Sequence, residues 1–314
     1  MIGFPPPQHS YSEEWVAYYA NEGAALTGGL SDRNKLFEAD EKKYVLHTLE
    51  NDSELYMMIE ASRLDIAPKV IVSLPEKKLA VMEYIEDSTI TPELAKRHCE
   101  EIGKALKKAH QIPLFKEKGE GFERENQIRW KYIRIQAARH NTELSAALLK
   151  EAGKAMQVFE KEMKSLDELH SSLKVNVHID LHPRNLFWVD KRFLIIDWES
   201  SSHGHPYFDV ASLSILLGFD EAEEKSLLDG YFAHPPTPEE LQEYALLKKI
   251  RWAYTSIVNT MWAFRVLEKK PAPHHIAPPE KSFSDYMQYF AETKGMPSLE
   301  FFVDVSRLAL KEIE

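Results

Sequence analysis

The chain has 314 residues, of which 44% are hydrophobic and 28% charged, which is enough apolar material for one large domain or two lobes. Its formal net charge of −11 disfavours a nucleic-acid partner, because an acidic surface repels phosphates, and it would attract a cationic small molecule. The alternative interpretation of this charge is solubility alone.

The single cysteine, Cys99, excludes an intramolecular disulfide and fits a reducing compartment. The first residues lack the basic start and apolar core of a signal peptide, and no apolar run approaches the length of a membrane span. We therefore expect a cytoplasmic protein that does not insert into a membrane.

Residues 1–85 predict a small, mostly antiparallel sheet with one helix. A Pro-rich lead over residues 1–12 precedes a short helix that ends near Tyr19. Strand patterns cover 44–47, 68–72 and 79–85, and an amphipathic helix covers 51–64. Between two runs of strand type lies a Gly-Gly loop, formed by Gly28, Gly29, Leu30 and Ser31. Such a loop lets backbone N–H groups approach a phosphate closely, although a Gly-Gly pair by itself is more often a hairpin turn.

Residues 86–314 predict a large, mostly helical lobe. Thr91 and Pro92 form an N-cap and first turn for a long helix that ends near residue 111. Further helices are expected over 126–140, 143–170, 209–219, 221–232, 238–268, 281–292 and 297–313. The boundary between the lobes falls near residues 84–87, and the cleft between them is the expected ligand site.

Within the helical part, residues 175–199 predict a strand, a polar loop and a hairpin. Asp180, Asn185 and Asp197 sit where these strands end, which would hold a general base beside two oxygen ligands for a hard divalent cation. The spacing His-x-Asp-Leu-x-x-x-Asn, followed by a second Asp, is that of a kinase catalytic loop. A metal cluster of His178, Asp180 and His182 is the alternative, but it leaves the Asn and the second Asp unexplained.

Seven stretches together resemble the aminoglycoside phosphotransferase and choline kinase superfamily: LTGGLSDRNKLF, YVLH, IAPKVI, VMEYIE, IGKALKKAHQIP, VHIDLHPRNLFWV and FLIIDWESSSHGHPYFDVASL. They occur in the family's order over most of residues 26–213, and Gly-Gly-Leu-Ser with Asp-Trp-Glu looks most like the choline kinase branch. The resemblance implies a two-lobed, protein-kinase-like α+β fold. Residues 1–85 would be the nucleotide-binding lobe, residues 86–314 the catalytic and substrate-binding lobe, and ATP and Mg²⁺ the cofactors.

The resemblance also implies roles for individual residues. Asp180 matches the catalytic base, Asn185 and Asp197 match the metal ligands, and His178 and Asp209 match residues that brace the loop. The Gly-Gly loop would cover the phosphates of the nucleotide. The hinge that binds adenine through its backbone would consist of Met82, Glu83, Tyr84 and Ile85.

The chain departs from the family at two places. His47 stands where the family has a Lys or Arg that reaches the phosphates and pairs with a helix acid, here Glu54, and histidine is mostly neutral at pH 7. There are three possibilities. The negative charges of Glu54 and ATP keep His47 protonated, or Lys43 or Lys35 substitutes for it, or nucleotide binding is impaired. Ile179 and Arg184 stand where glycine is common, and Arg184 would add a cation beside the metal site that contacts the γ-phosphate or remains solvated.

Trp252, Tyr254 and Trp262 lie on the predicted helix 238–268, where packing is the default interpretation and cation–π binding of a quaternary ammonium the sharper one. Glu199, close to Asp197, could attract a cationic substrate. We therefore predict an ATP- and Mg²⁺-dependent phosphotransferase that acts on a hydroxyl of choline or a similar amino alcohol. Aminoglycoside or thiamine kinase is the enzymatic alternative. A pseudokinase-like binding protein without catalysis is the alternative from another class, and no oligomeric state is predicted.

Overall fold

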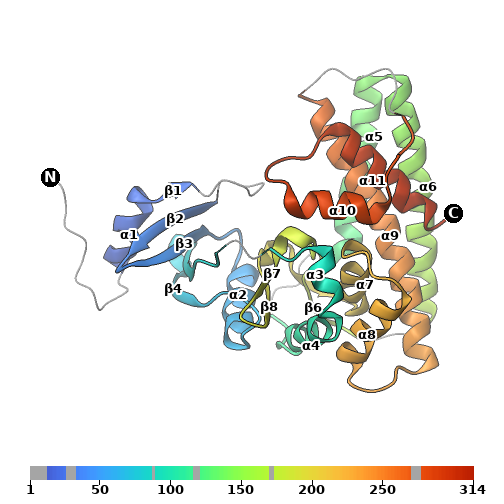
Figure 1. Ribbon diagram of the computed structural model, residues 1–314. Helices are drawn as coiled ribbons and strands as arrows, with labels where there is room; N and C mark the ends of the chain where they lie inside the picture. Colours follow the sequence, from blue (N-terminus) through green and yellow to red (C-terminus); the bar gives the residue numbers. More distant parts are fainter. Residues whose placement is uncertain (1–12, 26–32, 87–88, 116–120, 170–172, 270–276) are drawn as a thin grey trace.

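The computed structural model describes residues 13–25, 33–86, 89–115, 121–169, 173–269 and 277–314. Figure 1 shows a small lobe built on a sheet and a large lobe of helices, joined side by side. This arrangement confirms the predicted α+β, two-lobed fold class. None of the helices described is both long and apolar enough to cross a bilayer.

The small lobe contains one antiparallel sheet with the strand order β1-β2-β3-β5-β4. Its strands are β1 (Ala24–Ala25), β2 (Asn34–Ala39), β3 (Lys42–Thr48), β4 (Val70–Leu74) and β5 (Leu79–Glu83), with a 3-10 turn, η1 (Pro75–Lys77), before the last. Helix α1 (Glu13–Glu22) covers the outer face, where its Trp15 packs edge-on against Phe37 and Tyr44. Because side chains alternate along a strand, His47 points to the opposite, inner face.

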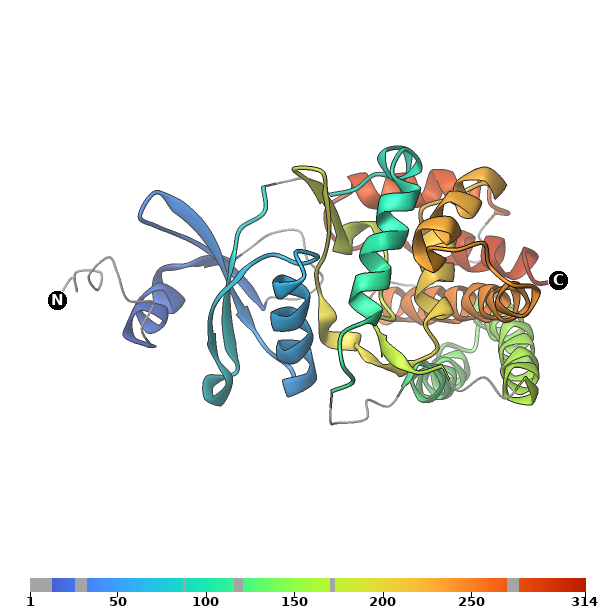
Figure 2. The ribbon, with the colours of Figure 1, turned by 90° about the horizontal axis from the view of Figure 1, so that it is seen from below.

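Helix α2 (Asp52–Arg63) lies between the sheet and the large lobe, as Figure 2 shows. Asn51 caps it, because the side-chain oxygen of Asn51 accepts the backbone N–H of Glu54 at 2.8 Å. The apolar side of α2 belongs to the main core of the large lobe, whereas the outer face of the sheet has its own cluster around Trp15. The predicted boundary near residue 85 stays a prediction. In terms of hydrophobic packing, α2 belongs with the large lobe, although it precedes this boundary in the chain.

The large lobe is mostly helical and contains two short two-stranded sheets. Its helices are α3 (Pro92–Lys96), α4 (Cys99–His110), α5 (Gly121–His140), α6 (Glu143–Glu168), α7 (Tyr207–Leu216), α8 (Glu221–Phe232), α9 (Pro238–Leu267), α10 (Phe283–Glu292) and α11 (Leu299–Lys311). Strands β6 (Val175–Val177) and β9 (Ser202–Gly204) pair with each other, as do β7 (Leu186–Val189) and β8 (Arg192–Ile195). The 3-10 turns η2 (Pro183–Asn185) and η3 (Trp198–Ser200) flank the second pair. Helix α9 is central and packs against α5, α6, α7 and α11.

The prediction of one long helix over 92–111 is wrong, since α3 and α4 are separate helices. The chain breaks at Arg97 and His98, where the His98 ring stacks on Trp188 of β7 with centroids 4.0 Å apart. The segment before the break is also tied to the hairpin, because the Ile90 N–H donates to the Leu186 carbonyl at 2.8 Å. These contacts with β7 outweigh the local preference for a continuous helix.

Helices α4 and α8 cross closely through a pair of glycines. A Cβ atom on Gly103 would lie 2.2 Å from the Leu227 carbonyl oxygen, and one on Gly230 would lie 2.2 Å from that of Glu100. The crossing brings His110 to Tyr231, with 2.8 Å between Nδ1 and the hydroxyl oxygen. His110 Nε2 lies 3.2 Å from Asp209, so the crossing supports the residue that holds the polar loop.

Candidate active site

The polar loop after β6 is held by Asp209 of α7. Its carboxylate accepts the backbone N–H of His178 at 2.6 Å and that of Ile179 at 3.0 Å. Ile179 has a φ of 71°, a left-handed conformation that is strained for a β-branched residue. On the other side, His178 Nε2 lies 2.9 Å from the Ile196 carbonyl oxygen. Asp209 and His178 therefore hold the loop in place through hydrogen bonds on its two sides. Asp209 also stabilises the strained turn before Asp180.

Asp180 is fixed by its backbone, while its side chain is 48% exposed. Asn185 Nδ2 donates to the Asp180 carbonyl oxygen at 3.0 Å, and His182 Nε2 lies 3.5 Å from Asp180 Oδ2. Although the side chain is partly exposed, the protein around it removes part of its hydration, which would raise the pKa of Asp180. The charges of His182, His178, Arg251 and Arg129 outweigh this effect and lower that pKa below its usual value. Asp180 is thus an ionised carboxylate that opens to solvent.

Oxygen atoms suited to a divalent cation gather beside Asp180. One oxygen each from Glu54, Asp197 and Glu199 lies within 4.8 Å of the other two. The amide nitrogen of Asn185 is engaged with Asp180, so its oxygen is the atom that could ligate a metal. Carboxylate and amide oxygens are the ligands that Mg²⁺ prefers, so the residues present fit this ion.

Burial and the neighbouring Asp180 raise the pKa of Asp197 above its usual value, because both disfavour its ionised form. Ionisation of Asp197 therefore costs more in the folded protein than in the unfolded chain when no cation is bound. We expect Asp197→Asn to raise the melting temperature of the ligand-free protein by a few degrees at pH 7 and to abolish Mg²⁺-dependent turnover.

Differential scanning calorimetry across pH checks this expectation. The gain in melting temperature should be complete above the raised pKa of folded Asp197. It should vanish below the ordinary aspartate pKa of 3.8, where Asp197 is protonated in both the folded and the unfolded state. A variant that melts lower than the wild type at pH 7 would contradict the assignment.

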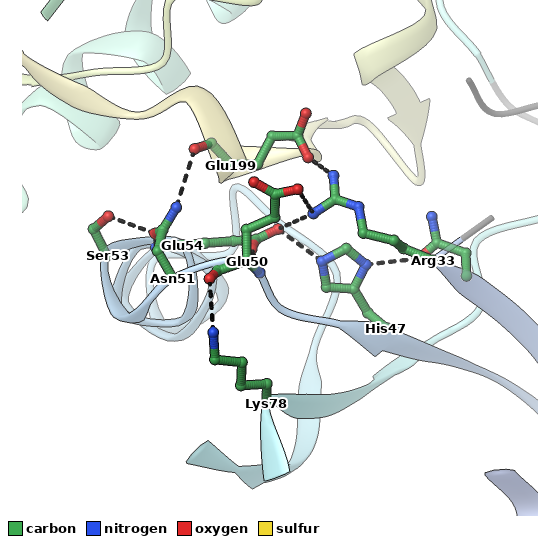
Figure 3. Close-up of polar contacts among 9 residues, drawn as sticks. Arg33, His47, Glu50, Asn51, Ser53, Glu54, Lys78 and Glu199 are labelled. Carbon is green, nitrogen blue, oxygen red and sulfur yellow. Dashed lines mark hydrogen bonds and ion pairs between the residues drawn. The ribbon is translucent and has the colours of Figure 1, made fainter. Parts of the chain in front are cut away.

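The small lobe contributes a second polar cluster, shown in Figure 3, around the fully buried Glu54. His47 Nε2 lies 2.7 Å from Glu54 Oε1, and His47 Nδ1 lies 2.7 Å from Asn34 Oδ1. The Glu50 N–H donates to the other Glu54 oxygen at 2.7 Å. Burial would raise the pKa of Glu54, but these hydrogen bonds and charges lower it, so Glu54 is ionised. The structure therefore brings the predicted pair His47 and Glu54 together.

Arg33 joins the same cluster and is a residue that the sequence reasoning missed. Its Nη1 lies 3.9 Å from Glu54 and 3.6 Å from Glu50, and its Nη2 pairs with Glu199 of the large lobe (Figure 3). The Asn51 side chain also donates to the Glu199 carbonyl oxygen at 3.5 Å. The available signal was a cation two residues after the Gly-Gly loop, in a chain that lacks the usual strand cation.

The remaining nucleotide residues are only partly placed. The Gly-Gly loop lies outside the described residues. Met82 and Glu83 end β5, and the backbone N–H groups of Glu83 and Tyr84 donate to the carbonyls of Lys69 and Lys43 at 2.9 and 3.2 Å. Ile85 follows directly. The adenine-binding role of this hinge stays a prediction.

Arg184 points to α10 and the chain that follows it. Its Nε and Nη1 donate to the carbonyls of Phe290 and Gly295, both at 2.8 Å, and its guanidinium lies 3.9 Å from the centre of the Phe290 ring. These contacts give the side chain a packing function. The predicted contact with a γ-phosphate finds no support in them.

The structure does not bring the four predicted substrate residues together. Trp252 packs edge-on against Phe283, and Trp262 stacks on Phe302 with its centroid 6.1 Å away. Tyr254 is two residues from Trp252, so the two point to different sides of α9. Burial and the charges of Glu125 and Asp180 raise the pKa of the Tyr254 hydroxyl, so this residue lies near the polar loop.

Two arginines flank the Tyr254 ring beside Phe208, and a quaternary ammonium would have to displace them. The guanidinium carbons of Arg129 and Arg251 lie 5.0 and 5.1 Å from the ring centre. Arg129 pairs with Glu125 at 2.7 Å, and Arg251 Nε donates to the Ser212 hydroxyl at 2.7 Å. Sequence reasoning missed both arginines, although a charge at the apolar position 251 of α9 was a possible signal.

The chain combines a two-lobed kinase-like fold with a braced Asp-x-x-x-x-Asn loop and a second Asp. These features are typical of phosphotransferases. A family model described as the phosphotransferase enzyme family matches residues 22–244, and the chain belongs to this family. This assignment confirms the predicted superfamily and the prediction of a small-molecule kinase.

Individual relatives are more distant. The chain is 26% identical over 208 residues to the Protein LicA homolog of Metamycoplasma hominis, which covers 63% of this chain and 74% of that protein. It shares the fold of choline kinase LicA from Streptococcus pneumoniae, with a TM-score of 0.58, 18% identity and coverage of 95% of this chain and 96% of that one. Spectinomycin phosphotransferase APH(9)-Ia, solved with ADP and spectinomycin, gives a TM-score of 0.50, 13% identity and coverage of 86% and 91%.

Proposed function

We propose that this protein transfers the γ-phosphate of ATP, with Mg²⁺, to a hydroxyl group of a small molecule in the cytoplasm. The observation that carries the proposal is the ionised, solvent-open Asp180 on a loop braced by Asp209, beside the oxygens of Asn185 and Asp197. The nucleotide bound to spectinomycin phosphotransferase supports ADP as the product.

Each residue has a part in the proposed reaction. Asp180 accepts a hydrogen bond from the acceptor hydroxyl and aligns its oxygen for in-line attack on the γ-phosphorus. Its low pKa makes it a weak base, so orientation is its main contribution and the proton transfers late. Asn185 and Asp197 would hold Mg²⁺, which neutralises charge on the phosphate oxygens.

An amino alcohol such as choline is the first acceptor to test. The names of the LicA homolog and of the pneumococcal choline kinase support this class, as do the net charge of −11 and the acids Glu125 and Glu199 near the catalytic loop. Aminoglycosides and thiamine remain the alternatives.

Arg129 and Arg251 favour a second acceptor class. Their charges act on Asp180, and Arg129 Nη1 is buried and makes no hydrogen bond within the described residues. An acceptor with a carboxylate or phosphate beside its hydroxyl would supply that bond.

A coupled assay of ADP release with a panel of alcohols tests the proposal. The panel is choline, ethanolamine, thiamine, spectinomycin, and two alcohols that carry a carboxylate, serine and glycerate. We expect at least one acceptor to raise ADP release tenfold or more above the acceptor-free rate. Millimolar ATP and Mg²⁺ should raise the melting temperature, because a ligand at 100 times its Kd adds about 2.7 kcal/mol to the free energy of unfolding. If the protein shows no acceptor-dependent turnover and is not stabilised by ATP, the result would favour the non-catalytic binding protein instead.

A further inference from the structure

We propose that Arg33 is the cation that binds the nucleotide phosphates, in place of the strand cation that this chain lacks at His47. The inference rests on the proposed use of ATP and adds to it a residue that no family motif assigns.

His47 is committed to other contacts. Both of its ring nitrogens have a partner at 2.7 Å, Asn34 on one side and Glu54 on the other, and the residue is only 6% exposed. To reach a phosphate it would have to leave the buried and ionised Glu54. That would leave a buried charge without its closest partner, which is costly.

The two lysines considered from the sequence point elsewhere. Lys35 pairs with Leu46 in the register of β2 and β3, so it lies on the opposite face of the sheet from Asn34 and His47. Lys43 shares the face of His47, but its amino group lies 3.9 Å from Glu86 and 5.7 Å from the centre of the Tyr84 ring. It therefore sits near the hinge, four residues along the strand from His47.

Arg33 has the position and the chemistry that the role needs. It precedes β2 directly and pairs with Glu54, the acid with which a strand cation would pair (Figure 3). Its side chain is 19% exposed, and Nη1 lies 3.6 to 3.9 Å from the nearest acids, beyond hydrogen-bond length. A guanidinium has five N–H donors in a planar fork, which suits phosphate oxygens while one edge stays with Glu54.

The contact of Arg33 with Glu199 gives the proposal a further consequence. Glu199 belongs to the large lobe and lies beside Asp197, so Arg33 currently joins the two lobes through this acid. A phosphate that takes Nη2 of Arg33 releases Glu199, which is then available to a cation. Binding of the nucleotide phosphates and release of Glu199 beside Asp197 are thus linked through the side chain of Arg33.

Nucleotide affinity measured without turnover tests the proposal. Binding of ADP and of adenosine is measured by competition with a fluorescent ADP analogue, for the wild type, Arg33→Ala, Arg33→Lys, Lys43→Ala and Arg63→Ala. Arg63 is the matched control, since it is an arginine of the same lobe whose side chain is 68% exposed and pairs with Glu60. Circular dichroism and melting curves establish that each variant is folded.

We expect Arg33→Ala to weaken ADP binding about 10- to 100-fold, the effect of one or two hydrogen bonds to a charged group. Adenosine binding should change less than twofold, Arg63→Ala and Lys43→Ala should bind ADP like the wild type, and Arg33→Lys should lie in between. ADP binding within threefold of the wild type in Arg33→Ala, an equal loss of adenosine binding, or a larger loss in Lys43→Ala would each overturn the role of Arg33. Absence of ADP binding in the wild type would instead overturn the proposed function together with this inference.

Discussion

Asp180→Asn should lower kcat by about 10²- to 10⁴-fold, the range that a positioned acid or base contributes. The substitution keeps the size of the side chain and removes the charge that orients the acceptor hydroxyl. KM for ATP should change little, because Asp180 belongs to the acceptor side of the reaction. Steady-state kinetics with the best acceptor of the panel measure both constants.

The melting temperature of Asp180→Asn is the control, because it shows whether the variant is folded. The side chain of Asp180 is 48% exposed, so the variant should melt close to the wild type. A variant that turns over at the wild-type rate while folded would show that phosphate transfer does not pass through Asp180, and the proposed mechanism would be wrong.

Asp209→Ala should have the largest effect on stability. The carboxylate is fully buried, and its loss leaves the backbone N–H groups of His178 and Ile179 without acceptors in the interior. At about 1–3 kcal/mol for each of these two groups, we expect the free energy of unfolding to fall by about 2–6 kcal/mol. Ile179 would also leave its left-handed conformation, so kcat should fall as Asp180 moves.

Urea denaturation of Asp209→Ala and of Asp229→Ala provides the comparison. Asp229 is an exposed acid that pairs with Lys225 one helical turn away, and its removal should change stability by less than about 0.5 kcal/mol. Equal midpoints for the two variants would contradict the role of Asp209 as the brace of the loop.

The candidate catalytic loop could be recognised from the sequence because its polar residues are contained in one continuous stretch. Asp180, Asn185 and Asp197 lie within 18 residues, and their spacing alone indicates a kinase-like site. The two-lobed fold was equally accessible, since a run of strand patterns precedes a run of helical ones. Asp209 was placed by resemblance, and the structure adds the two N–H groups that it binds.

Features that depend on contacts between distant segments could not be predicted. The break between α3 and α4 requires Trp188, about 90 residues away in the chain, to stack on His98. Strand β9 is three residues of Ser-His-Gly, which carry no strand signal until β6 lies beside them. Arg33 and Arg129 are ordinary charged residues in the sequence, and only folding brings them beside Glu54 and Tyr254.

The placement of α2 has a consequence for control of the enzyme. In a kinase-like fold, a helix that carries the paired glutamate can serve as a switch by swinging away from the cleft. Here that helix is anchored, because it shares the core of the large lobe and the Ile195 N–H donates to the Ile66 carbonyl just beyond its end. Displacing Glu54 would require separating a packed apolar interface. We therefore expect an enzyme that is not switched by a movement of this helix, so that its rate follows the supply of its substrates.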